Sequence, residues 1–215
     1  MIIYEVESKV KIFSYITGPI QVNTYLVYDE NTMKGFIVDP GDYSQKLSKQ
    51  AMDLGIDIEY IILTHGHGDH IGGVEKFKRD FSSAKLVAHE KEKEMLADAV
   101  MNCSAEFFPG GVTLTPDIWV KDGDKLQVGD MELKIIHTPG HTPGGMSIYV
   151  GNTLFSGDTL FRRSVGRTDF PGGDQRALIN SIKDRLFRLP DDTRVLPGHM
   201  GETTIGEEKR GNPFV

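Results

Sequence analysis

The order of apolar and polar positions predicts strands in the first forty residues. Runs rich in β-branched and aromatic residues and bounded by turn residues are typical of strands; they cover Lys9 to Ile16, Asn23 to Tyr28 and Gly35 to Asp39. Leu47, Ala51 and Leu54 recur at helical spacing and predict a helix from Tyr43 to Leu54. The continuous apolar run from Glu59 to Leu63 then indicates a buried strand.

The remainder of the chain alternates between the two kinds of element. We expect helices from about His70 to Phe81, from Glu90 to about Met101 and from Gln175 to Leu189, and a short last helix that begins at the capping pair Thr204 and Glu207. Strands are expected at Lys85 to His89, Lys125 to Val128, Glu132 to Ile136, Met146 to Val150 running on to Phe155, and Thr193 to Leu196. This order favours an α/β fold in which helices cover two sheets, a four-layer arrangement. We find no repeat or linker, so a single domain over residues 1–215 is expected.

Composition and charge narrow the class of protein. The 215 residues are 39% hydrophobic and 26% charged, as in ordinary globular proteins. We see no signal peptide and no apolar run of the roughly 20 residues that cross a bilayer, and we expect no membrane partner. The single cysteine excludes an internal disulfide and favours a cytoplasmic location. A net charge of −7 argues against a nucleic-acid partner.

The candidate chemistry lies in four loops that each follow a strand. His65, His67, Asp69 and His70 fall within six residues, separated only by glycines that let the backbone turn tightly. Imidazole and carboxylate groups are the usual ligands of zinc and related divalent metals. Three further glycine-bracketed turns contribute one candidate ligand each: His141, Asp158 and His199. A histidine-rich surface loop would explain the first cluster but not the other three loops, so the sequence predicts a metal site.

These motifs resemble those of the metallo-β-lactamase superfamily in order and spacing. The resemblance is carried by Thr64 to His70, Thr138 to Gly145, Ser156 to Phe161 and Pro197 to His199. It implies an αββα sandwich with two metals at one edge of the sheets. It also implies that His65, His67 and His141 bind the first metal, that Asp69, His70 and His199 bind the second, and that Asp158 bridges the two. The best-known zinc β-lactamases have a cysteine at the bridging position, whereas the aspartate resembles the glyoxalase II branch.

Within that branch the sequence resembles two kinds of enzyme. The segment from Gly157 to Phe161 followed by Gly166 to Phe170 is shared by glyoxalase II, a hydroxyacylglutathione thioesterase, and by mononuclear iron persulfide dioxygenases. The ending from Thr203 to Phe214 looks like short bacterial glyoxalase II-like proteins, so we favour the hydrolase and keep the dioxygenase as the alternative. Arg167 lies where glyoxalase II contacts the glutathione carboxylate, which predicts a substrate-binding role. With 16 residues after His199, we expect the chain to lack the helical C-terminal domain of full-length glyoxalase II.

The resulting hypothesis is a dinuclear metal-dependent hydrolase of thioesters. Two metals about 3.5–4 Å apart would generate a metal-bound hydroxide that attacks the thioester carbonyl, with Asp69 orienting it as a catalytic residue. Zinc is the expected metal, with iron and manganese as alternatives, and the partner is a small-molecule thioester, for which a glutathione thioester such as S-lactoylglutathione is one candidate. A purely structural metal module is the third alternative, although structural zinc sites are closed by protein ligands. The sequence leaves the acyl group, the thiol and the oligomeric state open.

Several other residues receive structural interpretations. His89 and His137 are expected to be core or supporting histidines rather than metal ligands. Cys103 is expected to be a partly buried small hydrophobic residue. The stretch Phe107 to Val112 is either an apolar lid over the site or ordinary core packing.

Overall fold

One sheet is built from the first half of the chain. The computed structural model describes residues 3–6 and 10–215, and side chains from residue 10 onward. In spatial order the strands are β1 (Ile3–Val6), β2 (Val10–Thr17), β3 (Val22–Asp29), β4 (Lys34–Val38), β5 (Asp57–Ile62), β6 (Lys85–His89) and β7 (Ile118–Val120). Strands β1 to β4 are antiparallel to their neighbours, whereas β4 to β7 run parallel. The parallel strands therefore end at one edge of the sheet.

The second half of the chain forms the other sheet. Its order is β15 (Thr203–Thr204), β14 (Arg194–Pro197), β11 (Thr153–Gly157), β10 (Met146–Val150), β9 (Met131–His137) and β8 (Lys125–Val128). The pairing of β11 with β14 is parallel and the others are antiparallel. A small hairpin of β12 (Leu160–Phe161) and β13 (Ser164–Val165) follows β11 directly.

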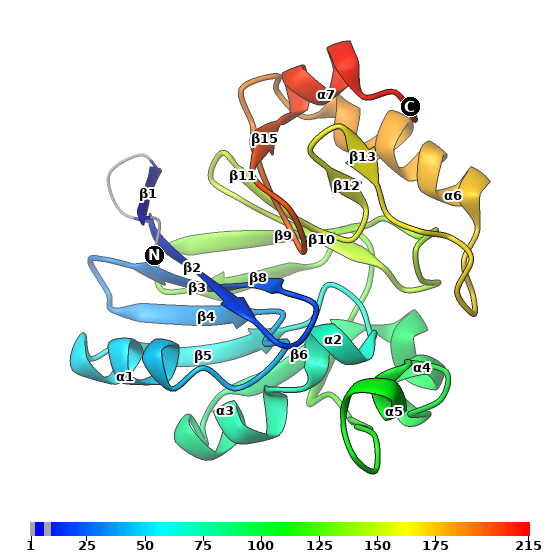
Figure 1. Cartoon of the computed structure of the whole chain (residues 1–215). Helices are drawn as coiled ribbons and strands as arrows, with labels where there is room; N and C mark the ends of the chain where they lie inside the picture. The colour runs from blue at the N-terminus through cyan, green and yellow to red at the C-terminus, as the bar shows by residue number, and fades with distance from the viewer. Residues whose placement is uncertain (1–2, 7–9) are drawn as a thin grey trace.

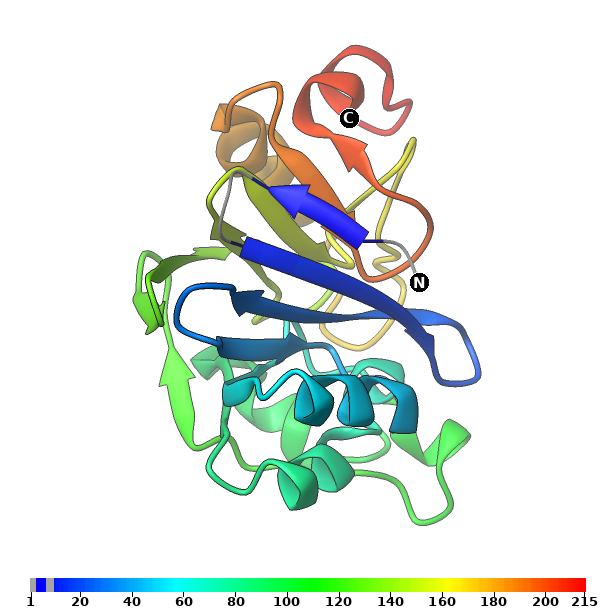
Figure 2. The ribbon, with the colours of Figure 1, turned by 90° about the vertical axis from the view of Figure 1, so that its left-hand side faces the viewer.

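Helices cover the outer faces of the two sheets (Figures 1 and 2). They are α1 (Gln45–Asp53), α2 (Gly68–Ile71), α3 (Val74–Asp80), α4 (Lys93–Ala97), α5 (Ser104–Phe107), α6 (Gln175–Asn180) and α7 (Ile205–Gly211), with short turns of 3₁₀- or π-helix at η2 (Glu90–Glu92), η3 (Ser181–Arg185) and η4 (Leu186–Arg188). In Figure 1, α1 and α3 lie on one side of the molecule and α6 and α7 lie on the opposite side. The predicted capping residue Thr204 accepts a hydrogen bond from the backbone N–H of Glu207 at the start of α7.

Three apolar clusters join the layers. Leu47 and Phe77 of the helices pack on Ile61 of the first sheet. Between the sheets, the rings of Phe36 and Phe155 meet edge to face with centroids 6.2 Å apart. A third cluster packs Leu178, Ile182 and Leu186 against Leu154 and Val195 of the second sheet. Burial of these apolar faces supplies most of the driving force for such a stack, and the four-layer αββα expectation is confirmed.

Some predicted elements were wrong in extent. The helix from His70 to Phe81 is interrupted at Gly72 and Gly73, where a Cβ atom on Gly72 would collide with the ring of Phe108 and the carbonyl of Gly41. The break separates α2, which carries Asp69 and His70, from α3.

Other boundaries also differ from the prediction. The helix expected from Glu90 to Met101 is the 3₁₀-turn η2 followed by α4, which ends at Ala97. The strand expected from Met146 to Phe155 is a hairpin of β10 and β11, which turns at Gly151, where φ is +57°. Strands β1, β7, β12, β13 and β15 were not predicted, and Lys9 lies outside the described residues.

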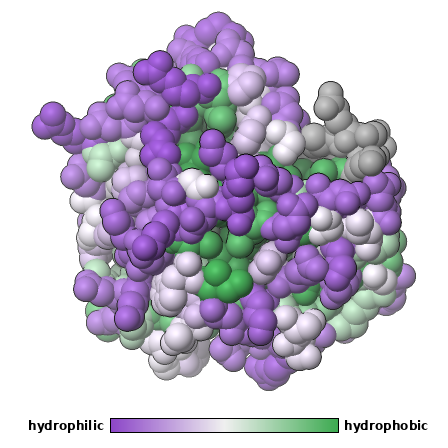
Figure 3. All heavy atoms as spheres, turned by 180° about the vertical axis from the view of Figure 1, so that it is seen from behind, coloured by the Kyte–Doolittle hydropathy of each residue, from purple (hydrophilic) through white to green (hydrophobic). Residues whose placement is uncertain are grey.

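The candidate ligands gather where strands of both sheets end. The loops after β5, β9, β11 and β14 all open at the same end of the sandwich, which is where rigid strands commonly present functional side chains. Of the helices described, none has the length and apolar character needed to cross a membrane. The face opposite to Figure 1 is mostly hydrophilic, with apolar atoms near its centre (Figure 3).

Candidate metal centre

The first group of candidate ligands contains His65, His67 and His141. One potential ligand atom from each lies within 4.8 Å of the others. His67 Nδ1 and His141 Nε2 are only 2.8 Å apart. Burial, and next the charge of His141, lower the pKa of His67 to about 3, so its ring is neutral at physiological pH. Neutral imidazoles aimed at a common point are what a divalent cation requires.

The second group contains Asp69, His70 and His199. Their ligand atoms also lie within 4.8 Å of one another. His70 Nε2 is 3.4 Å from Asp69 Oδ2, and His199 Nε2 is 3.2 Å from the same oxygen. His199 is the most exposed of the seven candidates, with 22% of its side chain accessible.

Asp158 lies between the two groups. Its Oδ1 is 3.4 Å from His70 Nε2, and its Oδ2 is 3.6 Å from both His141 Nε2 and His199 Nε2. Burial acts to raise the pKa of this carboxyl, but the nearby His70 charge and other histidines lower it well below its usual range. The ionised carboxylate thus faces both groups.

The centre contains buried polar atoms that lack hydrogen bonds. In the described part of the chain, these include the Nε2 atoms of His65, His67 and His70, and Asp158 Oδ1. Buried polar atoms without partners are rare in folded proteins because each costs its full desolvation free energy. Two divalent cations would supply partners for His65 Nε2, His70 Nε2 and Asp158 Oδ1, and the imidazole and carboxylate donors suit zinc, iron or manganese. The residues present therefore fit a two-metal centre.

A second set of contacts orients the histidines. His141 Nδ1 is 2.7 Å from the backbone carbonyl of Arg167, which can only accept, so the proton resides on Nδ1 and the Nε2 lone pair faces the site. His70 Nδ1 is 2.9 Å from Asp39 Oδ2. Asp39 also accepts hydrogen bonds from the backbone N–H and the hydroxyl of Thr64, the residue before His65.

Sequence reasoning missed Asp39 as a functional residue. Its φ of +46° is unusual for a residue other than glycine and signals a position held by its surroundings. The local signal in the sequence was a polar residue between the end of a strand and Pro40-Gly41, which reads equally well as an ordinary turn.

Glu92 was also missed. Its side chain is fully buried and its two oxygens accept the backbone N–H groups of Gly66, at 2.7 Å, and Gly144, at 2.6 Å. Burial raises the pKa of this carboxyl, while the hydrogen bonds act to lower it. One carboxylate thereby joins the loop of His65 and His67 to the loop of His141. No pattern within its own helix distinguishes it from its exposed neighbours.

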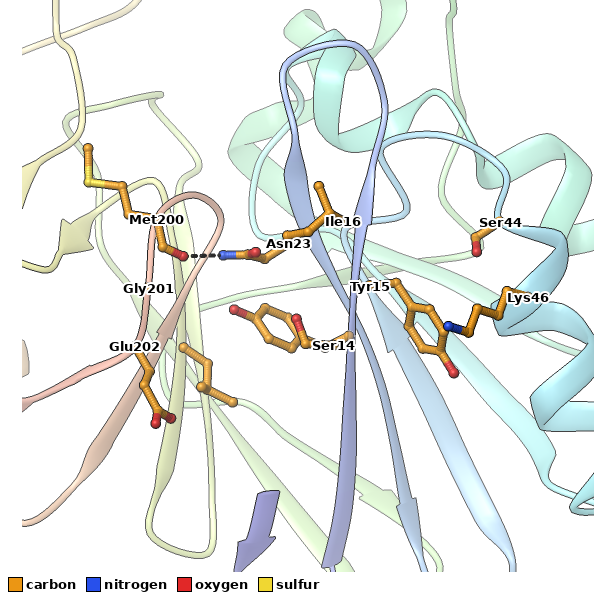
Figure 4. Close-up of a pocket in the computed structure, with 11 residues that line it drawn as sticks. Ser14, Tyr15, Ile16, Asn23, Ser44, Lys46, Met200, Gly201 and Glu202 are labelled. Carbon is orange, nitrogen blue, oxygen red and sulfur yellow. Dashed lines mark hydrogen bonds between the residues drawn. The ribbon is translucent and has the colours of Figure 1, made fainter. Parts of the chain in front are cut away.

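Asn23 and Tyr25 hold the loop that carries His199. Asn23 Nδ2 donates to the carbonyls of Pro197, at 3.0 Å, and Met200, at 2.8 Å, and the Tyr25 hydroxyl donates to Pro197 at 2.7 Å. Figure 4 shows Asn23 pointing from the first sheet to the Met200 carbonyl; both residues line a cavity of about 380 Å³. The two sheets are thus joined directly behind a candidate ligand.

A cavity of about 540 Å³ opens at the centre. It exposes five of the candidate ligands: His67, Asp69, His141, Asp158 and His199. Arg167 lines this cavity as well. Its guanidinium makes two hydrogen bonds to Asp169, at 2.9 and 2.7 Å, and lies 4.4 Å from the centroid of the Phe170 ring. The side chain predicted to bind substrate is therefore near the site but already paired with a carboxylate.

The structural interpretations of other residues agree with their surroundings. The rings of His89 and His137 stack with centroids 4.2 Å apart, away from the two ligand groups. Cys103 is partly buried and lines the cavity, and burial raises the pKa of its thiol. Phe107 also lines the cavity, whereas Phe108 lies against Gly72.

Several known proteins are similar to this chain in sequence or in fold. The hydroxyacylglutathione hydrolase GloC of Haemophilus influenzae is 36% identical over 198 residues, which cover 91% of this chain and 93% of GloC. The crystal structure of the B3 metallo-beta-lactamase BLEG-1 superposes with a TM-score of 0.87 at 38% identity, covering 94% and 98% of the two chains. That of TTHA1623 in a di-iron-bound form gives 0.82 at 36% identity, covering 94% of this chain and 100% of TTHA1623.

The match to a family is equally broad. Residues 17–199 match the Metallo-beta-lactamase superfamily, a span that begins in the first sheet and ends at the last candidate ligand. With the αββα fold and the two groups of candidate metal ligands, this match shows that the chain belongs to the metallo-beta-lactamase superfamily, and this membership supports a hydrolase as its class of enzyme.

Proposed function

We propose that this protein is a dinuclear metal-dependent hydrolase of thioesters, of the glyoxalase II type. The observation that carries the proposal is the pair of three-residue groups with Asp158 between them. In this proposal His65, His67 and His141 hold the first ion, Asp69, His70 and His199 hold the second, and Asp158 contacts both. Zinc is the proposed metal, with iron and manganese as alternatives because the same donors accept them.

Two bound ions would lower the pKa of a water molecule toward neutrality and polarise a substrate carbonyl. The protein's own residues keep the donors in place: Asp39 and the Arg167 carbonyl fix the ring orientations of His70 and His141. Asp69 is proposed as the catalytic carboxylate because it lines the cavity and its pKa is lowered, mainly by His70 acting against burial. An ionised Asp69 can accept a hydrogen bond from the attacking water and hold its oxygen toward the carbonyl.

A thioester suits a metal-dependent hydrolase because its leaving group needs no strong acid. Hydrolysis forms a C–O bond, breaks the C–S bond and releases a carboxylate and a thiol. A thiolate leaves without a strong acid because a thiol has a pKa of about 8.5, far below that of an alcohol. Cys103 is a poor alternative nucleophile, since burial and then the Glu106 charge raise the pKa of its thiol and keep it protonated.

The similarity to GloC supports thioester hydrolysis. The similarity to BLEG-1 supports a second candidate, hydrolysis of β-lactams, because that protein is named a metallo-beta-lactamase. The mononuclear persulfide dioxygenase remains a third candidate, but the presence of two groups of three donors favours a two-metal enzyme. A single domain and a cytoplasmic location stay predictions.

The test compares these activities on one preparation. Purified protein is analysed for metal content and assayed with S-lactoylglutathione and other acyl thioesters, with a chromogenic cephalosporin, and for oxygen uptake with glutathione persulfide. We expect two ions per chain and thioester cleavage that Asp69→Asn strongly reduces. One iron per chain with oxygen uptake would replace the proposal by the dioxygenase, and cephalosporin cleavage without thioester cleavage would replace it by the lactamase.

A further inference from the structure

The walls of the 540 Å³ cavity are apolar where they adjoin the metal centre. The Phe170 ring lies with its centroid 5.3 Å from that of His67, beside the first group of ligands. The Phe161 ring lies 6.2 Å from that of His199, beside the second group. Aromatic rings therefore flank the reacting position from both sides. The wall is completed by side chains from several separate segments: Ile20, Phe107, Val165 and Met200.

The charges on these walls do not favour an anion. Apart from the candidate ligands, the charged residues that line the cavity are Glu106 and Arg167. Arg167 is neutralised by its two hydrogen bonds to Asp169. Glu106 is exposed at the rim of the same space and has no cationic partner among the residues that line it other than Arg167, which is already paired. A carboxylate on the substrate would thus meet a wall with no net positive charge beyond the metals.

We propose that the substrate of this centre is a thioester of an apolar, uncharged acyl group on an uncharged thiol. The inference rests on the proposed thioester hydrolysis and names its substrate class. The acyl chain lies against the Phe170 and Phe161 rings, and carboxylate-bearing groups, such as a succinyl chain or the glutathione moiety, are disfavoured by Glu106 and by desolvation against the aromatic wall.

The first experiment varies the substrate. Acetyl, butanoyl and hexanoyl thioesters of N-acetylcysteamine, an uncharged thiol, are compared with the succinyl thioester of the same thiol and with hexanoyl-glutathione. Each methylene that enters the cavity should raise kcat/KM about threefold to fourfold until the cavity is filled. Both anionic substrates should be poorer than hexanoyl-N-acetylcysteamine. Equal or higher kcat/KM for the glutathione thioester would overturn the inference.

The second experiment varies the walls. Glu106→Gln should raise the ratio of kcat/KM for anionic over uncharged thioesters by about twofold to fivefold, the size expected for one charge several ångströms away in water. Phe170→Ala should flatten the dependence on chain length. Glu94→Gln, an exposed acid that does not line the cavity, and Phe214→Ala, whose ring is 57% exposed, are the matched controls and should change neither quantity.

A binding measurement separates this inference from the proposed function. Calorimetric titration of the metal-loaded protein with hexanoate, acetate and succinate reads the preference of the cavity without turnover. Absence of cleavage of every thioester would refute the proposed function, while tighter binding of hexanoate that Phe170→Ala abolishes would still support the apolar acyl site. Weaker binding of hexanoate than of succinate would overturn the inference even if thioesters are cleaved.

Discussion

Replacing Asn23 by alanine should loosen the loop that carries His199. The side chain of Asn23 makes two hydrogen bonds to this loop, one to the Pro197 carbonyl and one to the Met200 carbonyl. Alanine removes both, while the backbone N–H of residue 23 can still donate to Gly198, a bond of 2.8 Å. The change thus alters the support of one candidate ligand without touching it.

The size of the expected loss in stability depends on which hydrogen-bond donors each carbonyl still has after the change. The Pro197 carbonyl still accepts the Tyr25 hydroxyl, so its loss is about 1 kcal/mol, the usual net worth of one hydrogen bond. The Met200 carbonyl loses its side-chain donor, and because Met200 is 59% exposed, water can replace it at a cost near the lower end of about 1–3 kcal/mol. We expect the free energy of unfolding of the metal-free protein to fall by about 2 kcal/mol.

The same change should weaken one metal ion more than the other. His199 belongs to the second group, so only the second ion loses an oriented ligand. If about 1.4 kcal/mol of the lost support is expressed in binding, its dissociation constant rises about tenfold. Urea unfolding measures the stability, and titration with Co²⁺ followed by its visible absorption measures the two binding steps.

Two further variants control this experiment. Tyr25→Phe removes one hydrogen bond from a carbonyl that keeps Asn23, so it should cost about 1 kcal/mol and leave the second ion unchanged. Asn23→Asp places carboxylate oxygens against two carbonyls and should be at least as damaging as alanine. A loss of stability in Asn23→Ala with both dissociation constants unchanged would refute the positioning role.

Three other changes test the centre and its supports. Asp158→Ala should weaken both ions whereas His199→Ala should weaken mainly the second; metal analysis showing equal loss in the two variants would contradict the bridging role. Glu92→Gln places an amide NH₂ group opposite one of the two backbone N–H groups whose hydrogen bonds Glu92 accepts. Thermal unfolding should therefore show that the free energy of unfolding falls by about 1–3 kcal/mol. Burial is the main cause that lowers the pKa of His89 to about 4. Its unfolded form takes up a proton below about pH 6.5 while the folded form does not, so stability falls as the pH drops from about 6.5 to 4 by at most ~3 kcal/mol. His89→Phe should make that slope smaller in urea unfolding of the metal-free protein across this range, with the lowered pKa of His67 accounting for part of what is left, and an unchanged slope would exclude a contribution from His89.

Local patterns were sufficient for most of the framework. Strands and their ends could be predicted because alternation and apolar runs are local, and the helix break at Gly72 was the kind of feature that local patterns miss. That break depends on the approach of Phe108 and the Gly41 carbonyl, which lie elsewhere in the chain. The helical spacing of apolar residues continues through the break, so the sequence predicted a single helix.

The sequence by itself determined which residues are candidate metal ligands, because donor type and glycine-rich turns after strands are encoded in short segments. Only the tertiary structure decided what supports them. Asp39 reaches His70 across 31 positions, and Asn23 reaches Met200 across 177. Such hydrogen bonds leave no local signature.

The character of the cavity was decided in the same way. The sequence presented Arg167 as a positive residue near the site, and the structure pairs it with Asp169 and places it over Phe170. The apolar wall likewise joins Phe161 of β12 and Phe107 of α5, which lie far apart in the sequence. Side-chain type is a property of the sequence, but which charges cancel and which rings meet depends on distances that only folding sets.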